Sequence, residues 1–421
     1  PFGMLADRVR RTWTLSFAVL LWGVAMLLSA TSLTFGGLLF WRLWLGLVTA
    51  AAGPAVASLV GDYFPSAERG KIYSYILTGE LVGAGVGFTI TGDVAALSWR
   101  AGFVILALAA FPLAWALFKL PEPVRGGAGV LVSEKDAAAR QAGEQDGSSV
   151  REPPPPGRDP AEVAPASPYG ADDGQRTQVT DAQRLAAERG IEPDFRLVRS
   201  VVNNKKMGMI SATRYVLSVK TNVALIVSSA CGYYFLAGVE TFGAAFVESH
   251  YKVNAALANL LMIVVGGGAA VGIMSAGPIG DALLHRGRLN SRVLIAALAA
   301  SATVILFIPA LLTSSMVTAL PYVIFAAAAL SAQNPPIDAA RLDIMPAQLW
   351  GRAEGIRTFL RTMAQALAPL LFGFFSDQFG YQTTFFVMLL PLSASAFFLF
   401  RALRTYPKDV ATAAAATPSP G

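Results

Sequence analysis

The sequence GMLADRVRR occupies residues 3–11, directly before a long apolar stretch. Its glycine and aspartate are Gly3 and Asp7, and the same pair returns at Gly277 and Asp281, again just before an apolar stretch. The arginines that follow the two copies are Arg8, Arg10 and Arg11 in the first and Arg286 and Arg288 in the second. A motif that recurs at corresponding places indicates that the chain consists of two related halves.

Two further anchors recur in the same order. Residues 62–65 read DYFP and residues 343–346 read DIMP, each between corresponding apolar stretches. The residues that complete these anchors are Asp62, Arg69 and Gly70 in the first half and Asp343, Gly351 and Arg352 in the second. Trp99 and Phe103 similarly correspond to Tyr381 and Phe385. Three anchors in one order predict two parallel structural repeats.

The composition is that of a membrane protein. Of the 421 residues, 54% are hydrophobic and 14% charged, and the mean hydropathy is +0.52, which differs from the balance of soluble domains. The single cysteine, Cys231, excludes an intramolecular disulfide and a cysteine-based metal cluster. The sequence also lacks phosphate-binding and nucleophile motifs, so we expect neither an enzyme nor a cofactor or metal.

Stretches of about 20 apolar residues, long enough to cross a bilayer, recur along the chain. We predict ten spans, at residues 12–31, 38–60, 72–97, 100–120, 222–247, 256–280, 292–313, 316–339, 356–375 and 383–400. The predicted fold class is therefore an all-α polytopic membrane protein.

The basic residues predict the orientation of these spans. Since successive helices alternate in direction, the loops form two sets, and one set holds most of the Lys and Arg residues. By the positive-inside rule that set is cytoplasmic, together with the central segment and the C-terminus. Topology thus accounts for the net charge of +6, and we expect no nucleic-acid partner. The expected location is the plasma or inner membrane, with the lipid bilayer as partner and a monomeric state.

Composition divides the chain into five parts. The predicted parts are an N-terminal bundle at 1–120, a disordered cytoplasmic linker at 121–183, an amphipathic region at 184–219, a six-helix bundle at 220–405 and a disordered tail at 406–421. The linker is rich in Pro, Gly and charged residues and has no apolar periodicity. The amphipathic region suits either a helix on the cytoplasmic membrane surface or a helix packed on the base of the bundle.

The motif at residues 3–11 resembles the cytoplasmic loop motif that joins helices two and three in the major facilitator superfamily. Arg42 with Gly46 resembles the arginine motif of that family's fourth helix, and Gly79, Gly83 and Gly87 resemble its glycine-rich fifth helix. The resemblance implies two pseudo-symmetric bundles with ten of twelve helices present, the first two being absent from an N-terminally truncated chain. Residues 343–369 are similar to bacterial spinster-like members.

The resemblance implies transport by alternating access, in which two bundles rock about a central site. The charged motifs then form a cytoplasmic gate that closes in one state and opens in the other. The candidate gate residues are Gly3, Asp7, Arg8, Arg11, Asp62, Arg69, Gly277, Asp281, Arg286, Arg288, Asp343, Arg352 and Arg357. We expect Asp281 to pair with Arg286 or Arg352 when the gate is closed. The alternative is that these charges only set the topology.

Three ionisable residues lie within predicted spans, where a charge is expensive and commonly faces the bundle interior. Arg42, Glu80 and Glu240 are therefore candidates for binding substrate or protons, although Arg42 and Glu240 could instead extend to the interface. Glycines at every fourth residue predict close helix packing. They are Gly79, Gly83 and Gly87 in one span and Gly268 and Gly272 in another.

Three functions remain open on this basis. The first is proton-coupled export of an amphiphilic or drug-like small molecule, an efflux antiporter. The second is proton-coupled uptake of a small organic anion held by Arg42. The third is a membrane sensor or scaffold that transports nothing and signals through the linker, although the duplicated gate motifs favour a transporter.

Overall fold

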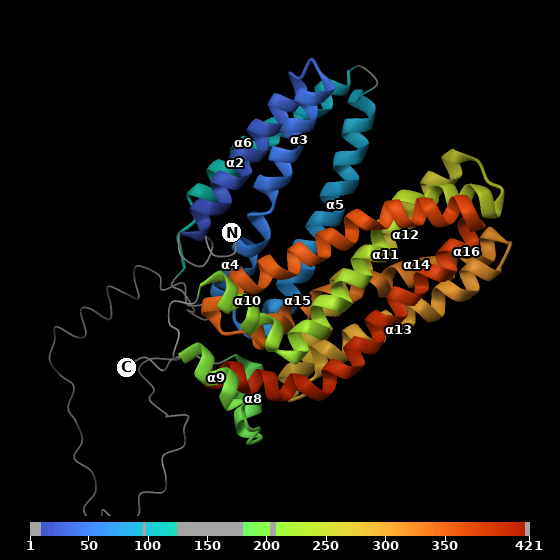
Figure 1. Ribbon diagram of the computed structural model, residues 1–421. Coiled ribbons are helices and arrows are strands. Elements are labelled where there is room, and N and C mark those ends of the chain that lie inside the picture. Colours follow the sequence, from blue (N-terminus) through green and yellow to red (C-terminus); the bar gives the residue numbers. More distant parts are fainter. Residues whose placement is uncertain (1–9, 96–97, 124–179, 203–207, 417–421) are drawn as a thin grey trace, which may run out of the picture.

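The computed structural model describes residues 10–95, 98–123, 180–202 and 208–416 (Figure 1). These residues form α-helices and two short 3-10 helices, without a strand. Eight helical stretches among them are long and apolar enough to cross a membrane. The last of these stretches contains two crossings, and α5 (Arg69–Ala95) adds one more. The described part of the chain thus provides the ten spans that hydropathy predicts. Gly3, Asp7, Arg8 and most of the expected linker lie outside the described residues.

The described part of the N-terminal bundle contains five α-helices. They are α2 (Arg11–Ala30), α3 (Phe35–Thr49), α4 (Ala52–Tyr63), α5 (Arg69–Ala95) and α6 (Trp99–Phe118). The helices α3 and α4 together form the span predicted at residues 38–60, which is interrupted at Ala50 and Ala51. The 3-10 helix η1 (Ser66–Glu68) follows Pro65, whose ring fixes the turn between α4 and α5.

The C-terminal bundle repeats this arrangement. Its helices are α11 (Lys220–Tyr251), α12 (Ala255–His285), α13 (Ser291–Leu312), α14 (Met316–Ala332), α15 (Asn334–Asp343) and α16 (Trp350–Ala416). The predicted span at 316–339 is divided into α14 and α15 before the prolines Pro335 and Pro336. The 3-10 helix η2 (Ala347–Leu349) follows Pro346, as η1 follows Pro65. Gly380 has a φ of 76° and separates two crossings within α16.

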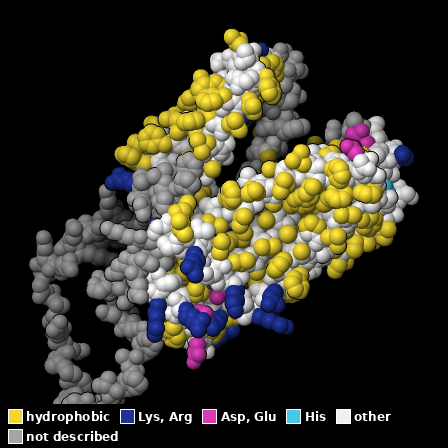
Figure 2. Space-filling model, viewed as in Figure 1, with side chains coloured by type: hydrophobic (Ala, Val, Ile, Leu, Met, Phe, Trp, Pro, Cys, Tyr) yellow, Lys and Arg dark blue, Asp and Glu magenta, His cyan; other side chains and the backbone are white. Residues whose placement is uncertain are grey.

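The two bundles touch at one end and diverge toward the other (Figure 1). At the closed end, α4, η1 and the start of α5 meet α12, α15 and the start of α16. Hydrophobic side chains cover the flanks of the molecule, as lipid requires, and Lys and Arg side chains gather near α8 (Asp181–Glu188) and α9 (Phe195–Val202) (Figure 2). We call the end where the two bundles touch the basic end, and the opposite end the open end.

Three short helices occur among the described residues 180–202 and 208–219. They are α8 (Asp181–Glu188), which begins within the stretch predicted as linker, α9 (Phe195–Val202) and α10 (Met209–Ser218). Their apolar residues pack on the base of the C-terminal bundle, where Ala186 and Val216 belong to the same core as Ile344. The described part of this region thus takes the packed arrangement of the two that its amphipathic pattern allows.

The prediction of a disordered tail at 406–421 is wrong for residues 406–416. The last helix continues to Ala416, and Tyr406 and Val410 are fully buried. Alanine is the strongest helix former, so the alanine-rich end extends the helix once a partner surface is present. Asp409 also accepts a 2.8 Å hydrogen bond from the backbone N–H of Thr221, which fixes the tail to the start of α11.

Candidate functional site

Arg292, near the start of α13, is the centre of an ion cluster at the closed end. Its side chain is 1% exposed. Arg292 Nη2 lies 2.7 Å from Asp281 Oδ1, and Nη1 lies 2.5 Å from Asp343 Oδ2. The Tyr406 hydroxyl donates to the same Asp343 oxygen at 2.8 Å. Two carboxylates and one guanidinium are therefore buried together, which is favourable only while each keeps its partners.

The same cluster joins the two bundles. Arg292 Nη2 also donates to the backbone carbonyl of Ser66 in η1. The backbone N–H of Lys71 in α5 donates to Asp281 Oδ2 at 2.9 Å. The backbones approach closely here, because a Cβ added at Gly277 would lie 2.0 Å from the carbonyl oxygen of Gly70. Glycine at 277 thus permits the contact that Asp281 and Arg292 stabilise.

The helix α8 adds a second connection across the boundary. The backbone N–H of Asp181 donates to Ser66 Oγ at 2.7 Å, and Ser66 Oγ donates to Asp181 Oδ2 at 3.1 Å. On the other side, Gln183 Nε2 donates to the carbonyl of Asp343 at 3.1 Å. One helix therefore holds η1 of the first bundle and α15 of the second.

Within the N-terminal bundle, Arg11 forms a cluster of its own. Its guanidinium pairs with Asp62 and, through Nε at 2.9 Å, with Glu122 Oε1. Glu122 also accepts from the backbone N–H groups of Arg11 and Thr12, each at 3.0 Å. Partial burial opposes ionisation of Glu122, but these hydrogen bonds at the positive end of α2 outweigh it, so the pKa of the carboxyl is lowered.

A third cluster lies one turn further from the basic end. Arg357 Nη1 lies 3.0 Å from Asp338 Oδ1, and Arg357 Nη2 lies 2.7 Å from Glu354 Oε1. Arg341 pairs with the same two carboxylates. Gly53 of α4 faces Glu354, since a Cβ at this glycine would lie 3.8 Å from Glu354 Oε1. This cluster therefore also lies at the boundary between the bundles.

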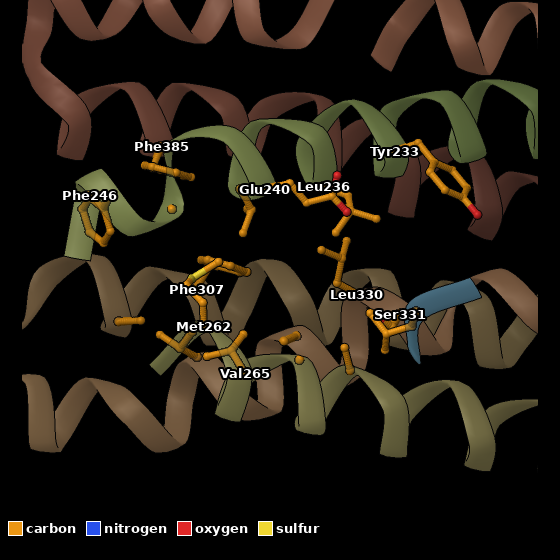
Figure 3. Close-up of a pocket in the computed structure, with 18 of the residues that line it drawn as sticks. Tyr233, Leu236, Glu240, Phe246, Met262, Val265, Phe307, Leu330, Ser331 and Phe385 are labelled. Carbon is orange, nitrogen blue, oxygen red and sulfur yellow. The ribbon is translucent and has the colours of Figure 1, made fainter. Parts of the chain in front are cut away.

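Beyond these clusters lies a cavity of about 420 Å³ between α5 and the C-terminal bundle. Glu80 faces it from α5 and Glu240 from α11. Figure 3 shows Tyr233, Glu240 and Phe246 on one side of the cavity, with Phe307 and Leu330 on the other. Its size is that of a pocket for a drug-sized molecule. A cavity between two bundles that are closed at one end is the arrangement of an alternating-access site.

A family model described as the Major Facilitator Superfamily matches residues 1–334 and, in a second match, residues 226–420. The chain belongs to the major facilitator superfamily. Two curated relatives match parts of this facilitator. Protein spinster homolog 3 of Homo sapiens is 30% identical over 132 residues, which are 30% of this chain and 26% of the relative. The hexuronate transporter of Bacillus subtilis (strain 168) is 27% identical over 118 residues, 27% of each chain.

Solved facilitators share the fold over most of the chain. The proton:xylose symporter XylE superposes with a TM-score of 0.62 at 14% identity, covering 95% of this chain and 81% of that one. A bacterial homologue of the human lysosomal transporter Spinster, in an inward-facing conformation, gives a TM-score of 0.54 at 17% identity, covering 97% and 86%. At such identities the likeness establishes the fold alone. The matched stretches span only about a quarter of the length of each curated relative.

The expected partners of Asp281 are wrong in this facilitator. Arg286 and Arg288 are exposed, and the described hydrogen bonds of Asp281 go to Arg292 and the backbone of Lys71. Arg352 is buried elsewhere on α16. Sequence reasoning missed Arg292 because the second loop is longer than the first. A signal was present: the interval from Asp62 to Asp343 also relates Arg11 to Arg292.

Arg69 and Arg42, two of the other predicted residues, lie in different places. Arg69 is buried, and its guanidinium lies 5.0 Å from the ring of Trp350 in the opposite bundle. Arg42 does not line the cavity. Its guanidinium lies 4.2 Å from the ring centre of Phe103 in α6, which accounts for its charge within the N-terminal bundle.

The predicted glycines differ in their surroundings. A Cβ at Gly272 would lie 1.9 Å from the carbonyl oxygen of Ala328 in α14, and one at Gly268 would lie 2.8 Å from that of Ile324. These glycines allow α12 and α14 to pack closely. A Cβ at Gly79, Gly83 or Gly87 meets no described atom within 4 Å, so the packing role expected for them does not appear among the described residues. The described close contacts of α5 with α12 lie nearer its start, at Gly70, Lys71 and Ser74.

Proposed function

We propose that this facilitator exports an amphiphilic small molecule in exchange for protons, with the basic end in the cytoplasm of a plasma or inner membrane. The observation that carries the proposal is the cavity of about 420 Å³, which lies beyond an ion cluster that joins the two bundles at the basic end only. Such a cavity can receive or release a ligand at the open end while the closed end blocks leakage.

The proposed gate consists of Asp281, Arg292 and Asp343, with Ser66 and Lys71 as their partners in the first bundle. These contacts exist only while the bundles touch at the basic end. A conformational equilibrium responds to interactions that differ between its states, so these contacts favour the state that is open at the other end. Inward opening must separate Lys71 from Asp281 and Ser66 from Arg292.

Glu80 is the proposed proton carrier. It lies on α5, faces the cavity and is exposed to it. Protonation neutralises a carboxylate at this position. The free-energy cost of placing this side chain in an apolar passage therefore depends on whether the carboxylate carries a proton. Transport of protons and substrate through one cavity would couple the two flows.

The relatives leave the substrate class open, since one is named a spinster homologue and the other a hexuronate transporter. Two features favour an amphiphile over a small anion. Apolar side chains form most of the cavity wall, and Arg42, the candidate for holding an anion, is stacked on Phe103 outside the cavity. A scaffold without transport would have no use for a cavity closed by a separable gate.

The test uses the full chain in proteoliposomes with fluorescent amphiphiles and labelled hexuronates. We expect a pH gradient to drive amphiphile movement, and Glu80→Gln to abolish the response to the gradient while the protein still folds. The conservative Glu80→Asp should retain part of it. Gradient-driven hexuronate uptake without amphiphile movement would replace the proposal with the anion alternative. Absence of any transport, in protein whose labelling pattern also fails to change with pH, would overturn it.

A further inference from the structure

The cavity carries two acidic groups, one from each side. Glu80 comes from the N-terminal bundle and Glu240 from the C-terminal bundle, and both side chains are exposed to the cavity. Neither carboxylate forms an ion pair or hydrogen bond within the part of the chain that the structure describes. This differs from the carboxylates of the gate, each of which is matched to an arginine.

No Lys or Arg side chain belongs to the described cavity lining. The guanidinium of Arg361 lies 4.5 Å from the ring centre of Tyr233, a residue of the lining. Arg361 follows Glu354 and Arg357 along α16, so its charge is associated with the acidic groups of that cluster. The cavity itself therefore presents negative charge that no described cationic side chain within it compensates, and a bound cation would compensate it.

The remaining wall suits an apolar body with a positive charge. Phe246, Phe307 and Phe385 present aromatic rings, and Tyr233 and Tyr251 add two more. Aromatic faces attract cations and also bury hydrocarbon. Met262 supplies an adaptable thioether to the same wall. A small inorganic ion would leave this apolar surface uncovered, whereas a drug-sized organic cation would cover it.

We infer that the transported substrate is a lipophilic organic cation, whose charge is held between Glu80 and Glu240 and whose apolar body lies against the aromatic wall. The inference rests on the proposed function, since it names the substrate class of the same cavity. Glu240 is then a binding residue, and its role is distinct from the proton-carrying role proposed for Glu80.

The sharpest test compares tetraphenylphosphonium with tetraphenylborate, two ions of nearly the same shape and opposite charge. Binding to the purified full chain in lipid nanodiscs should favour the cation by at least about tenfold, equivalent to ~1.4 kcal/mol. Glu240→Gln should reduce cation affinity about tenfold and leave the affinity for a neutral amphiphile of similar size unchanged. Glu248→Gln, on the same helix but outside the cavity lining, is the matched control and should bind the cation as the wild type does.

Equal binding of both ions, or preference for the borate, would overturn the inference, as would unchanged cation affinity in the Glu240→Gln protein. The thermal midpoint of each variant distinguishes loss of binding from loss of folding, and the comparison of the two ions in the wild type needs no variant. Transport of neutral amphiphiles without cation preference would refute the cation site and leave the proposed function in place. Cation binding with no transport in proteoliposomes would refute the proposed function alone.

Discussion

Arg11 and Arg292 occupy equivalent places in the two halves: each pairs with the aspartate that lies 51 residues further along the chain, Asp62 and Asp343 respectively. Both arginines are 1% exposed. The two pairs differ in what surrounds them. Arg11 also pairs with Glu122 in its own bundle. Arg292 instead pairs with Asp281 and donates a hydrogen bond to a carbonyl of the opposite bundle. The repeated pair thus belongs to a cluster within one bundle in the first half and to a cluster that contacts both bundles in the second.

Asp281→Asn should move the equilibrium toward molecules that are open at the basic end. The amide keeps the shape of the side chain but loses the charge that binds Arg292, and charge-assisted hydrogen bonds contribute about 1.5–3 kcal/mol. We expect a shift of about tenfold, ~1.4 kcal/mol. A single cysteine at Leu330, in a Cys231→Ser background, should become more reactive from the basic end. Asp377→Asn, exposed at the open end, is the control; equal reactivity in both variants would mean that Asp281 is only a structural charge.

Ser66→Ala should weaken the connection made by α8. The substitution removes the hydroxyl that accepts from the N–H of Asp181 and donates to its carboxylate, and a hydrogen bond contributes about 1 kcal/mol. Inward-open molecules should increase several-fold by the same labelling assay, while the thermal midpoint changes little. Ser200→Ala, an exposed serine of α9 that bonds only to its own helix, serves for comparison. A smaller shift for Ser66 than for Ser200 would contradict a connecting role for α8.

Glu122→Gln should lower stability in a manner that depends on pH. Because the pKa of Glu122 is lowered in the folded protein, its contribution is present above the ordinary glutamate value of about 4.3 and disappears as the pH falls through the folded value. We expect a loss of about 1 kcal/mol at pH 7. The thermal midpoints of wild type and variant should approach each other as the pH falls below the ordinary glutamate value. A difference that stays constant throughout such an acid titration would refute the charge-based account.

Gly272→Ala should destabilise the C-terminal bundle, because its Cβ would collide with the backbone of Ala328 in α14. Overpacking of this kind costs about 1–3 kcal/mol. Gly83→Ala has open space beside it and should be tolerated. Thermal unfolding in detergent measures both. Equal midpoints for the two variants would show that α12 and α14 adapt without cost.

Much of the fold could be predicted from the sequence. The crossings follow from hydropathy because transfer into lipid is a sum over the residues of one short segment, and neighbours elsewhere in the chain change it little. The two halves follow from the recurrence of DYFP and DIMP, since both copies specify the same turn after a proline. Glu80 and Glu240 were found because a carboxylate within a span is rare.

Tertiary structure decided which groups the charged residues contact. Spacing along the chain suggested Arg286 for Asp281, but the longer loop places Arg292 beside it, and a buried pair depends on position in space rather than on separation in sequence. The alanine-rich end became a helix only because α8, α10 and α11 offer it a surface. The sequence by itself therefore determined which segments cross the membrane and that the chain consists of two related halves. Only the packing of the two bundles decided which charges pair across their boundary and which line the cavity, because both properties arise where distant segments meet.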